Sequence, residues 1–227
     1  QQGSVLANYA AETLKAKTIA IIDDRTAYGQ GLADVVEKVA KEKGLKVVAR
    51  EFTNDKATDF KAILTKVRGA KPDVVMYGGM DATAGPMAKQ MKQLGIKSVL
   101  LAGDGVCSPE FIKLAGDAAG IMHCSMAGEA VEKLAKGEEF KAKFKAAFNQ
   151  DVQIYSPYSY DAVYIIADAA KRAGKADRAA ITAAMPATSY PGLTGTIAFD
   201  EKGDIKGGAI SMFKVSGDKL EYISTVR

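Results

Sequence analysis

The sequence contains few of the residues that usually carry out chemistry. Its 227 residues include one histidine and two cysteines. No CxxC pair and no Cys/His cluster gives the ligand spacing of a metal site, and no GxSxG or GxxxxGK[ST] motif occurs. The single histidine, His123, lies in an apolar run beside Cys124, where a histidine is more often structural than catalytic. These absences argue against an enzyme, and they suggest neither a metal nor any other cofactor.

Long apolar runs and concentrated charge are also missing. No apolar stretch approaches the roughly 20 residues that a membrane helix needs. The net charge of +4 comes from 31 Lys and Arg against 27 Asp and Glu, spread along the chain without a basic block. This distribution does not favour nucleic-acid binding. The chain starts at Gln1 with no secretory signal, as a processed or truncated chain also would.

Apolar, β-branched runs recur at intervals of about 25 residues in the first half of the chain. They predict strands at 18–23, 45–52, 73–79, 98–104 and 121–128. Amphipathic helices are predicted between them, because apolar residues recur at i, i+3, i+4 and i+7. This alternation predicts an α/β fold with a parallel, doubly wound sheet over residues from about 4 to 127.

Local signals predict where these helices begin and end. The first spans 31–44 and ends at Gly44, and the second is entered through Thr58 or Asp59. Pro86 is predicted to open the third, and Ser108 to cap the fourth.

The pattern changes after residue 128. Helices are predicted at 138–148, 156–174 and 176–185, with no strand between them. A strand near 195–204 and a hairpin that turns at 216–218 close the chain. The apolar faces of the three helices need a sheet to cover, and the first unit has already used its own sheet. We therefore expect these helices to pack against something that this chain lacks.

The first strand ends in Asp23 and Asp24, a pair of acids that also begins a phosphate-accepting receiver domain. A receiver would carry its phosphoacceptor aspartate at the end of the third strand. Here that strand ends in two glycines, and Asp81 lies beyond them. We therefore interpret the paired acids as residues that end a strand and organise a turn.

Ligands of doubly wound folds bind at the carboxyl ends of the strands. In this chain those ends carry Tyr28, Met80 and Asp104, which offer a hydroxyl, an apolar wall and a partner for an ammonium group. The structural alternatives are that Asp104 only caps a turn and that Tyr28 only packs at a helix start. Cys107 and Cys124 lie seventeen positions apart, and the residues alone leave open two buried thiols or a disulfide.

Five stretches, taken in order, resemble type I periplasmic solute-binding proteins of ABC transporters, within the leucine/isoleucine/valine-binding group. They are QQGSVLANY, IAIIDDRTAYGQGLAD, DVVMYGGMDATAGPMAKQM, GDGVCSPEFIKLAGDAAG and TGTIAFDEKGDIKGG. The resemblance spans essentially the whole chain and implies the carboxyl-terminal two-thirds of such a protein. Residues 1–127 would be the carboxyl-terminal ligand-binding lobe, 128–203 would belong to an amino-terminal lobe whose sheet is mostly missing, and 204–227 would cross back. The missing amino-terminal segment is then the first partner to look for.

The resemblance also assigns roles to single residues. Tyr28 corresponds to a cleft tyrosine, Asp104 to the acid that pairs with the ligand's α-ammonium, and Tyr155 to an aromatic residue from the hinge region. Met80 occupies a position that is often Tyr, so the departure leaves the identity of the ligand open. An exported protein of this kind also implies a disulfide between Cys107 and Cys124.

The function implied by the resemblance is that of a periplasmic substrate-binding component of an ABC importer, from which a signal peptide has been removed or is absent. It would capture a branched-chain or related amino acid in an interlobe cleft and deliver it to a membrane permease. The alternative is an amino-acid- or amide-responsive sensor or regulator on the same fold, with a receiver domain as a more distant one.

Overall fold

The computed structural model describes residues 1–226, which divide into two compact units. Unit 1 comprises residues 1–127 and 210–226, and unit 2 comprises residues 128–209. The chain thus re-enters unit 1 at Ile210, within the segment 204–227 that was predicted to cross back. That these units are the two lobes of the family stays a prediction. None of the described helices is long and apolar enough to cross a membrane.

Unit 1 is built on one seven-stranded sheet with the order β2-β1-β3-β4-β5-β8-β9. The strands are β1 (Thr18–Asp23), β2 (Lys46–Phe52), β3 (Val74–Gly78), β4 (Val99–Ala102), β5 (Met122–Ala127), β8 (Ile210–Ser216) and β9 (Lys219–Val226). The pairings from β2 to β5 are parallel, and the hairpin β8–β9 adds two antiparallel strands beside β5. The mixed α/β class with a mostly parallel central sheet is as the sequence predicts.

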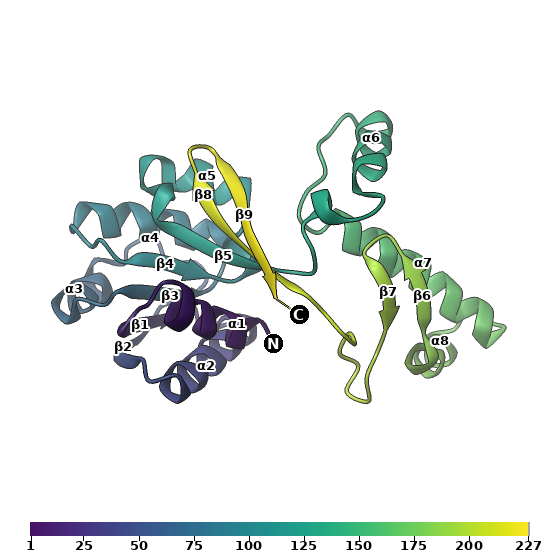
Figure 1. Ribbon diagram of the computed structural model, residues 1–227, viewed down its shortest axis with the longest axis horizontal. Coiled ribbons are helices and arrows are strands. Elements are labelled where there is room, and N and C mark those ends of the chain that lie inside the picture. The colour runs from purple at the N-terminus through teal and green to yellow at the C-terminus, as the bar shows by residue number, and fades with distance from the viewer. Residues whose placement is uncertain (227) are drawn as a thin grey trace. The chain divides into compact units, whose positions relative to one another are not determined.

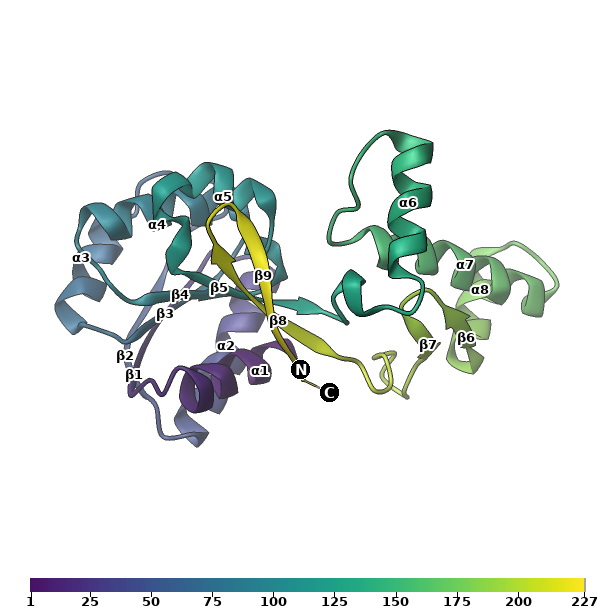
Figure 2. The ribbon, with the colours of Figure 1, turned by 45° about the horizontal axis from the view of Figure 1, so that its top comes forward.

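Helices cover both faces of this sheet (Figures 1 and 2). Helices α1 (Gln2–Asn8) and α2 (Ala27–Glu42) lie on one face, and α3 (Lys61–Ala70), α4 (Asp81–Gln93) and α5 (Pro109–Ala115) lie on the other. Because both faces are covered, strand β3 is buried along its whole length, which explains why its sequence is continuously apolar rather than alternating.

The beginning of helix α4 corrects a prediction. It starts at Asp81, and Pro86 lies inside it rather than at its first position. Asp81 accepts a hydrogen bond from Ser108 Oγ at 2.6 Å, and a Cβ on Gly85 would lie 2.4 Å from Leu114 Cβ. These contacts hold α4 tightly against the Ser108–Ala115 region, and tertiary packing therefore outweighs the local preference of proline for a helix start.

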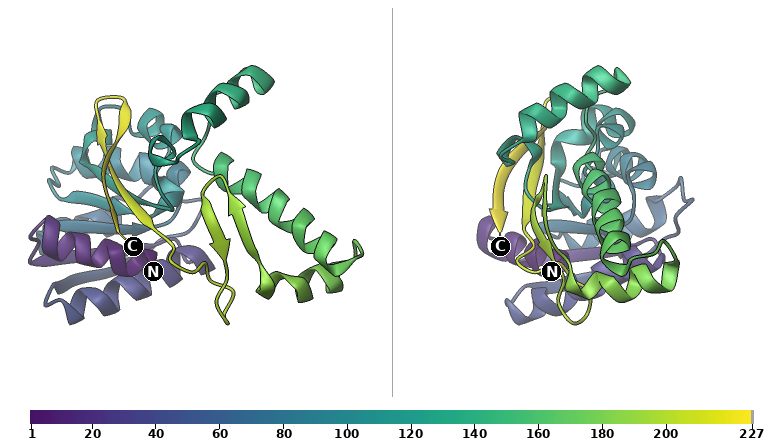
Figure 3. Two further views of the ribbon diagram at one scale, coloured as in Figure 1. Left: turned by 45° about the vertical axis from the view of Figure 1, so that its right-hand side comes forward. Right: turned by 90° about the vertical axis from the view of Figure 1, so that its right-hand side faces the viewer.

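Unit 2 contains α6 (Gly137–Phe148), α7 (Ser156–Ala173), α8 (Arg178–Ala184) and a two-stranded sheet of β6 (Ser189–Gly192) and β7 (Gly195–Ala198). The three helices follow the predicted ranges, whereas only one strand was expected here. Figure 3 shows the β6–β7 hairpin beside α7. Asp161 on α7 accepts hydrogen bonds from Leu193 N at 2.7 Å and Thr194 N at 2.8 Å, so a buried carboxylate fastens the hairpin turn to the helix.

Candidate functional site

The paired acids at the end of β1 hold the backbone of their own turn. Asp23 is buried, pairs with the guanidinium of Arg50, and accepts a hydrogen bond from Arg25 N at 2.9 Å. This contact supports Arg25 in the left-handed region, at φ 61°. Asp24 Oδ1 accepts from both the backbone N and the hydroxyl of Thr26, at 3.0 and 2.6 Å. Both acids therefore shape the turn that leads to Tyr28.

Tyr28 is delivered by the first turn of α2. Thr26 caps this helix, because its Oγ1 accepts a hydrogen bond from Gly29 N at 3.0 Å. A Cβ on Gly29 would lie 2.4 Å from the carbonyl oxygen of Gly78, which leaves no room for a side chain where the helix start passes the end of β3. The glycine thus places the start of α2, and with it Tyr28, directly over the strand ends.

Met80 and Asp104 follow the two next strands of the sheet. Met80 comes after Gly78 and Gly79 at the end of β3, immediately before α4, and its side chain is 46% exposed. Asp104 begins the 3-10 helix Asp104–Val106 directly after β4. The carboxyl ends of adjacent parallel strands lie at one edge of the sheet, so both side chains emerge where Tyr28 does.

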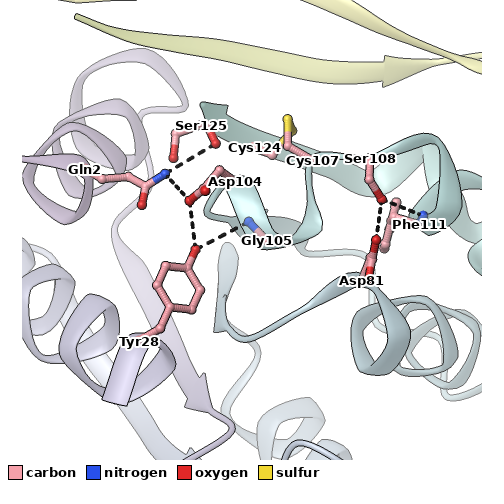
Figure 4. Close-up of a disulfide and its surroundings, with 10 residues drawn as sticks. All are labelled: Gln2, Tyr28, Asp81, Asp104, Gly105, Cys107, Ser108, Phe111, Cys124 and Ser125. Carbon is pink, nitrogen blue, oxygen red and sulfur yellow. Dashed lines mark hydrogen bonds between the residues drawn. A yellow bond between two sulfur atoms is a disulfide. The ribbon is translucent and has the colours of Figure 1, made fainter. Parts of the chain in front are cut away.

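The structure brings these three predicted residues together, and Figure 4 shows Tyr28 and Asp104. Tyr28 Oη donates a hydrogen bond to Asp104 Oδ1 at 3.1 Å, and Gly105 N lies 3.5 Å from the same hydroxyl. A Cβ on Gly105 would lie 2.6 Å from Met80 Sδ and 3.4 Å from Tyr28 Cε1. The glycine therefore allows the thioether and the phenol ring to approach the loop that carries Asp104.

A disulfide fixes the far side of this loop. Cys107 and Cys124 are joined, with Cα atoms 5.5 Å apart, and both side chains are fully buried. Because Cys124 lies in β5, the bond ties the loop after β4 to the neighbouring strand. Ser108 ties the loop to α4 through Asp81, as Figure 4 also shows. The Asp104 loop is thus held by covalent and hydrogen bonds on the side away from Tyr28.

This arrangement has the chemistry to bind an ammonium group. A half-buried carboxylate can form a charge-assisted hydrogen bond with an ammonium group, and a tyrosine ring and a methionine offer apolar walls beside it. Among the described residues, no group of three or more His, Cys, Asp or Glu side chains could hold a metal ion.

The remaining predicted site residue, Tyr155, belongs to unit 2. It precedes α7, is 49% exposed, and lines a pocket together with Phe140, Phe144 and Phe148. The other three predicted residues lie in unit 1, and the role of Tyr155 in ligand binding stays a prediction.

The single histidine pairs with a tyrosine of the same unit. His123 Nδ1 lies 2.8 Å from Tyr9 Oη, in a pair in which the tautomer decides the donor. Burial lowers the pKa of His123, and the nearby charge of Lys214 lowers it further.

Sequence reasoning missed Gln2. Its side-chain Nε2 donates a hydrogen bond to Asp104 Oδ1 at 2.8 Å from the start of α1, a helix that was not predicted. The spacing of Val5, Leu6, Tyr9 and Ala10, all buried, is the helical signal that was available.

A sequence profile of the family described as periplasmic binding protein matches residues 1–219. The chain is 38% identical over 216 residues to the Leu/Ile/Val-binding protein homolog 1 of Brucella abortus, covering 94% of this chain and 57% of that protein. It is 33% identical over 213 residues to the leucine-, isoleucine-, valine-, threonine- and alanine-binding protein of Pseudomonas aeruginosa, again with 94% and 57% coverage. The chain therefore spans less than two thirds of the length of these curated relatives.

Solved structures are similar over nearly the whole chain. The leucine-binding protein LivK of Thermotoga maritima superposes with a TM-score of 0.91 at 25% identity, covering 99% of this chain and 65% of that one. LivJ of Streptococcus pneumoniae, solved in complex with isoleucine, has a TM-score of 0.83 at 26% identity, with 99% and 64% coverage.

Proposed function

Because this chain belongs to the periplasmic binding protein family, we propose that it is the substrate-binding component of an ABC importer and that it binds a branched-chain or related amino acid. The names of the similar proteins support this ligand class, since they include leucine-, isoleucine- and valine-binding proteins. The proposal places the protein in the periplasm, with a membrane permease as its partner.

The single observation that carries the proposal is the position of Asp104. Its half-buried carboxylate lies at the carboxyl end of β4, within hydrogen-bond distance of the Tyr28 hydroxyl. The following residue, Gly105, lies against Met80. We assign Asp104 to the ligand's α-ammonium group, and Tyr28 and Met80 to the ligand's surroundings. A carboxylate in this place selects a zwitterionic amino acid over the same carbon skeleton without the amino group.

The ligand's carboxylate needs partners as well. We propose that these partners come from an amino-terminal segment. The relatives are longer than this chain, and their names describe them as amino-acid-binding proteins. Binding experiments are therefore designed for the longest product that the gene encodes.

The test is calorimetric titration of leucine, isoleucine and valine into the protein and into its Asp104→Asn variant. Loss of the charge-assisted hydrogen bond should weaken binding at least tenfold, since such a bond is worth about 1.5 to 3 kcal/mol. Asp218→Asn is the matched control, because Asp218 is an exposed aspartate in the β8–β9 turn of the same unit. Equal affinities of the protein and the Asp104→Asn variant would remove Asp104 from the site.

A sensor or regulator on the same fold would bind the ligand too. The two differ in the segment that precedes or follows this chain in the complete coding sequence. A signal peptide supports the importer component, and a DNA-binding or signalling domain supports the regulator.

A further inference from the structure

Gln2 reaches the binding acid from a part of the chain 102 positions away. Its Nε2 donates to Asp104 Oδ1 at 2.8 Å and lies 3.5 Å from the carbonyl oxygen of Ser125 in β5. Figure 4 shows the side chain of Gln2 extending from α1 toward Asp104. Helix α1 is itself anchored, because Leu6 and Ala7 are fully buried in the core of unit 1. The amide is therefore presented from a fixed backbone.

Two neutral donors converge on the same carboxylate oxygen. Tyr28 Oη lies 3.1 Å and Gln2 Nε2 lies 2.8 Å from Asp104 Oδ1. Gly103 makes room for the Tyr28 hydroxyl, since a Cβ there would lie 2.3 Å from it. Two donors on one oxygen fix the rotation of the carboxylate group, and that rotation decides where its second oxygen points.

The chemistry of the donor matters as much as its position. An amide N–H bonds strongly to an ionised carboxylate, yet it carries no charge and so leaves the carboxylate its full charge. A lysine at the same place could also donate to Asp104, but its charge would compete with the ammonium group of the ligand.

We propose that Gln2 is a positioning residue for amino-acid binding, whose amide aims the Asp104 carboxylate at the ligand's ammonium group without neutralising it. The inference rests on the proposed function, because it needs an ammonium-bearing ligand at Asp104. The inference adds to the proposed site a residue that contacts Asp104 rather than the ligand.

The first test uses Gln2→Met, which keeps the length of the side chain and removes its donor. Affinity for leucine should fall about three- to tenfold, the effect of one hydrogen bond. Affinity for 4-methylpentanoate, which is leucine without its amino group, should not change. Gln2→Lys should weaken leucine binding more than Gln2→Met, because the lysine occupies the carboxylate with an internal cation. Gln93→Met, at the exposed end of α4, is the matched control and should bind leucine like the unchanged protein.

The second test combines substitutions. If Gln2 acts through Asp104, adding Gln2→Met to Asp104→Asn should leave the affinity for leucine where Asp104→Asn alone puts it. Additive losses in the double variant would overturn the inference, as would equal losses for leucine and 4-methylpentanoate or an unchanged affinity of Gln2→Met.

A protein that binds leucine with none of these Gln2 effects contradicts the role of Gln2 alone. A protein that binds no amino acid contradicts the proposed function itself. Circular dichroism of each variant establishes that it is folded before titration, and Gln2→Leu, which also removes the donor, provides the same comparison should Gln2→Met not fold.

Discussion

Unit 1 and unit 2 differ in how completely each buries its own apolar side chains. In unit 1 the strands β1 and β3 are almost wholly buried between two layers of helices. In the described part of unit 2, the buried apolar side chains outside glycine and proline are Ala130, Ile165, Ala169 and Ile197. Large apolar side chains there are exposed instead, among them Phe148 at 63% and Val163 at 66%.

The difference shows that an amphipathic pattern predicts a helix without supplying the surface that covers it. Unit 1 contains both its sheet and the helices on that sheet, and we expect it to be the more stable part. Unit 2 contains helices with a two-stranded sheet, and much of its apolar surface is left uncovered by the chain itself. We expect the amino-terminal segment proposed above to cover it.

The largest expected effect comes from truncating a core side chain in unit 1. Ile21 lies in β1 and is fully buried, so Ile21→Ala should lower the free energy of unfolding by about 2 to 5 kcal/mol. Val163→Ala in unit 2 should change it by less than about 0.5 kcal/mol in this chain, because Val163 is exposed. Urea unfolding followed by circular dichroism measures both. Similar losses for the two variants would mean that Val163 is covered in solution.

Removing the disulfide should have the next largest effect, and should act on unit 1 only. Replacing Cys107 and Cys124 by serine should lower the free energy of unfolding by about 2 to 4 kcal/mol, since the bond closes a loop within unit 1. Urea titrations with and without a reducing agent measure the same effect in the unchanged protein. A midpoint that does not respond to reduction would show that the cross-link is absent.

The two glycines after Tyr28 should respond differently to the same substitution. Gly29→Ala should cost about 1 to 3 kcal/mol, because its Cβ would lie 2.4 Å from Gly78 O, whereas a Cβ on Gly31 meets nothing within 4 Å. Gly31→Ala should be neutral or stabilising by up to about 1 kcal/mol, as alanine is the better helix former. Thermal unfolding of both variants makes the comparison. The account of the turn is wrong if Gly31→Ala is the more damaging of the two.

The smallest effect concerns pH and again belongs to unit 1. Burial holds the pKa of His123 below its ordinary value, so the unfolded chain binds a proton more readily than the folded one. The resulting stability is present above the unfolded pKa of about 6.5 and should be lost as the pH falls through that value toward the folded pKa. Urea midpoints at several pH values should therefore decline less in His123→Gln than in the unchanged protein. Parallel pH profiles of the two proteins would contradict this assignment.

The sequence predicts most of unit 1, because its strands are buried on both faces and therefore appear as continuous apolar runs. All five predicted strands there occur within one or two residues of their expected ends. The predicted start of α4 was wrong because Asp81 and Gly85 contact Ser108 and Leu114. A local sequence pattern contains no information on such distant contacts. Strand β6 was missed because Pro191 and Gly192 break the alternation that usually indicates a strand.

The sequence predicts the candidate site only through the rule that ligands of parallel α/β sheets bind at the carboxyl ends of the strands. The sequence predicts that Tyr28, Met80 and Asp104 follow strands of one parallel sheet, and the structure shows that these strands, β1, β3 and β4, are neighbours. Gln2 was not predictable, since its contact with Asp104 joins residues 102 positions apart through a helix outside the β-α-β pattern.

Hydrogen exchange with and without leucine, read out by mass spectrometry on the longest gene product, tests the central claim most directly. If Asp104 binds the ammonium group, leucine should slow exchange in the three strand-end segments 26–30, 80–84 and 103–107 of unit 1, and 4-methylpentanoate at the same concentration should slow it much less. Leucine binding that leaves these three segments unprotected would contradict the account.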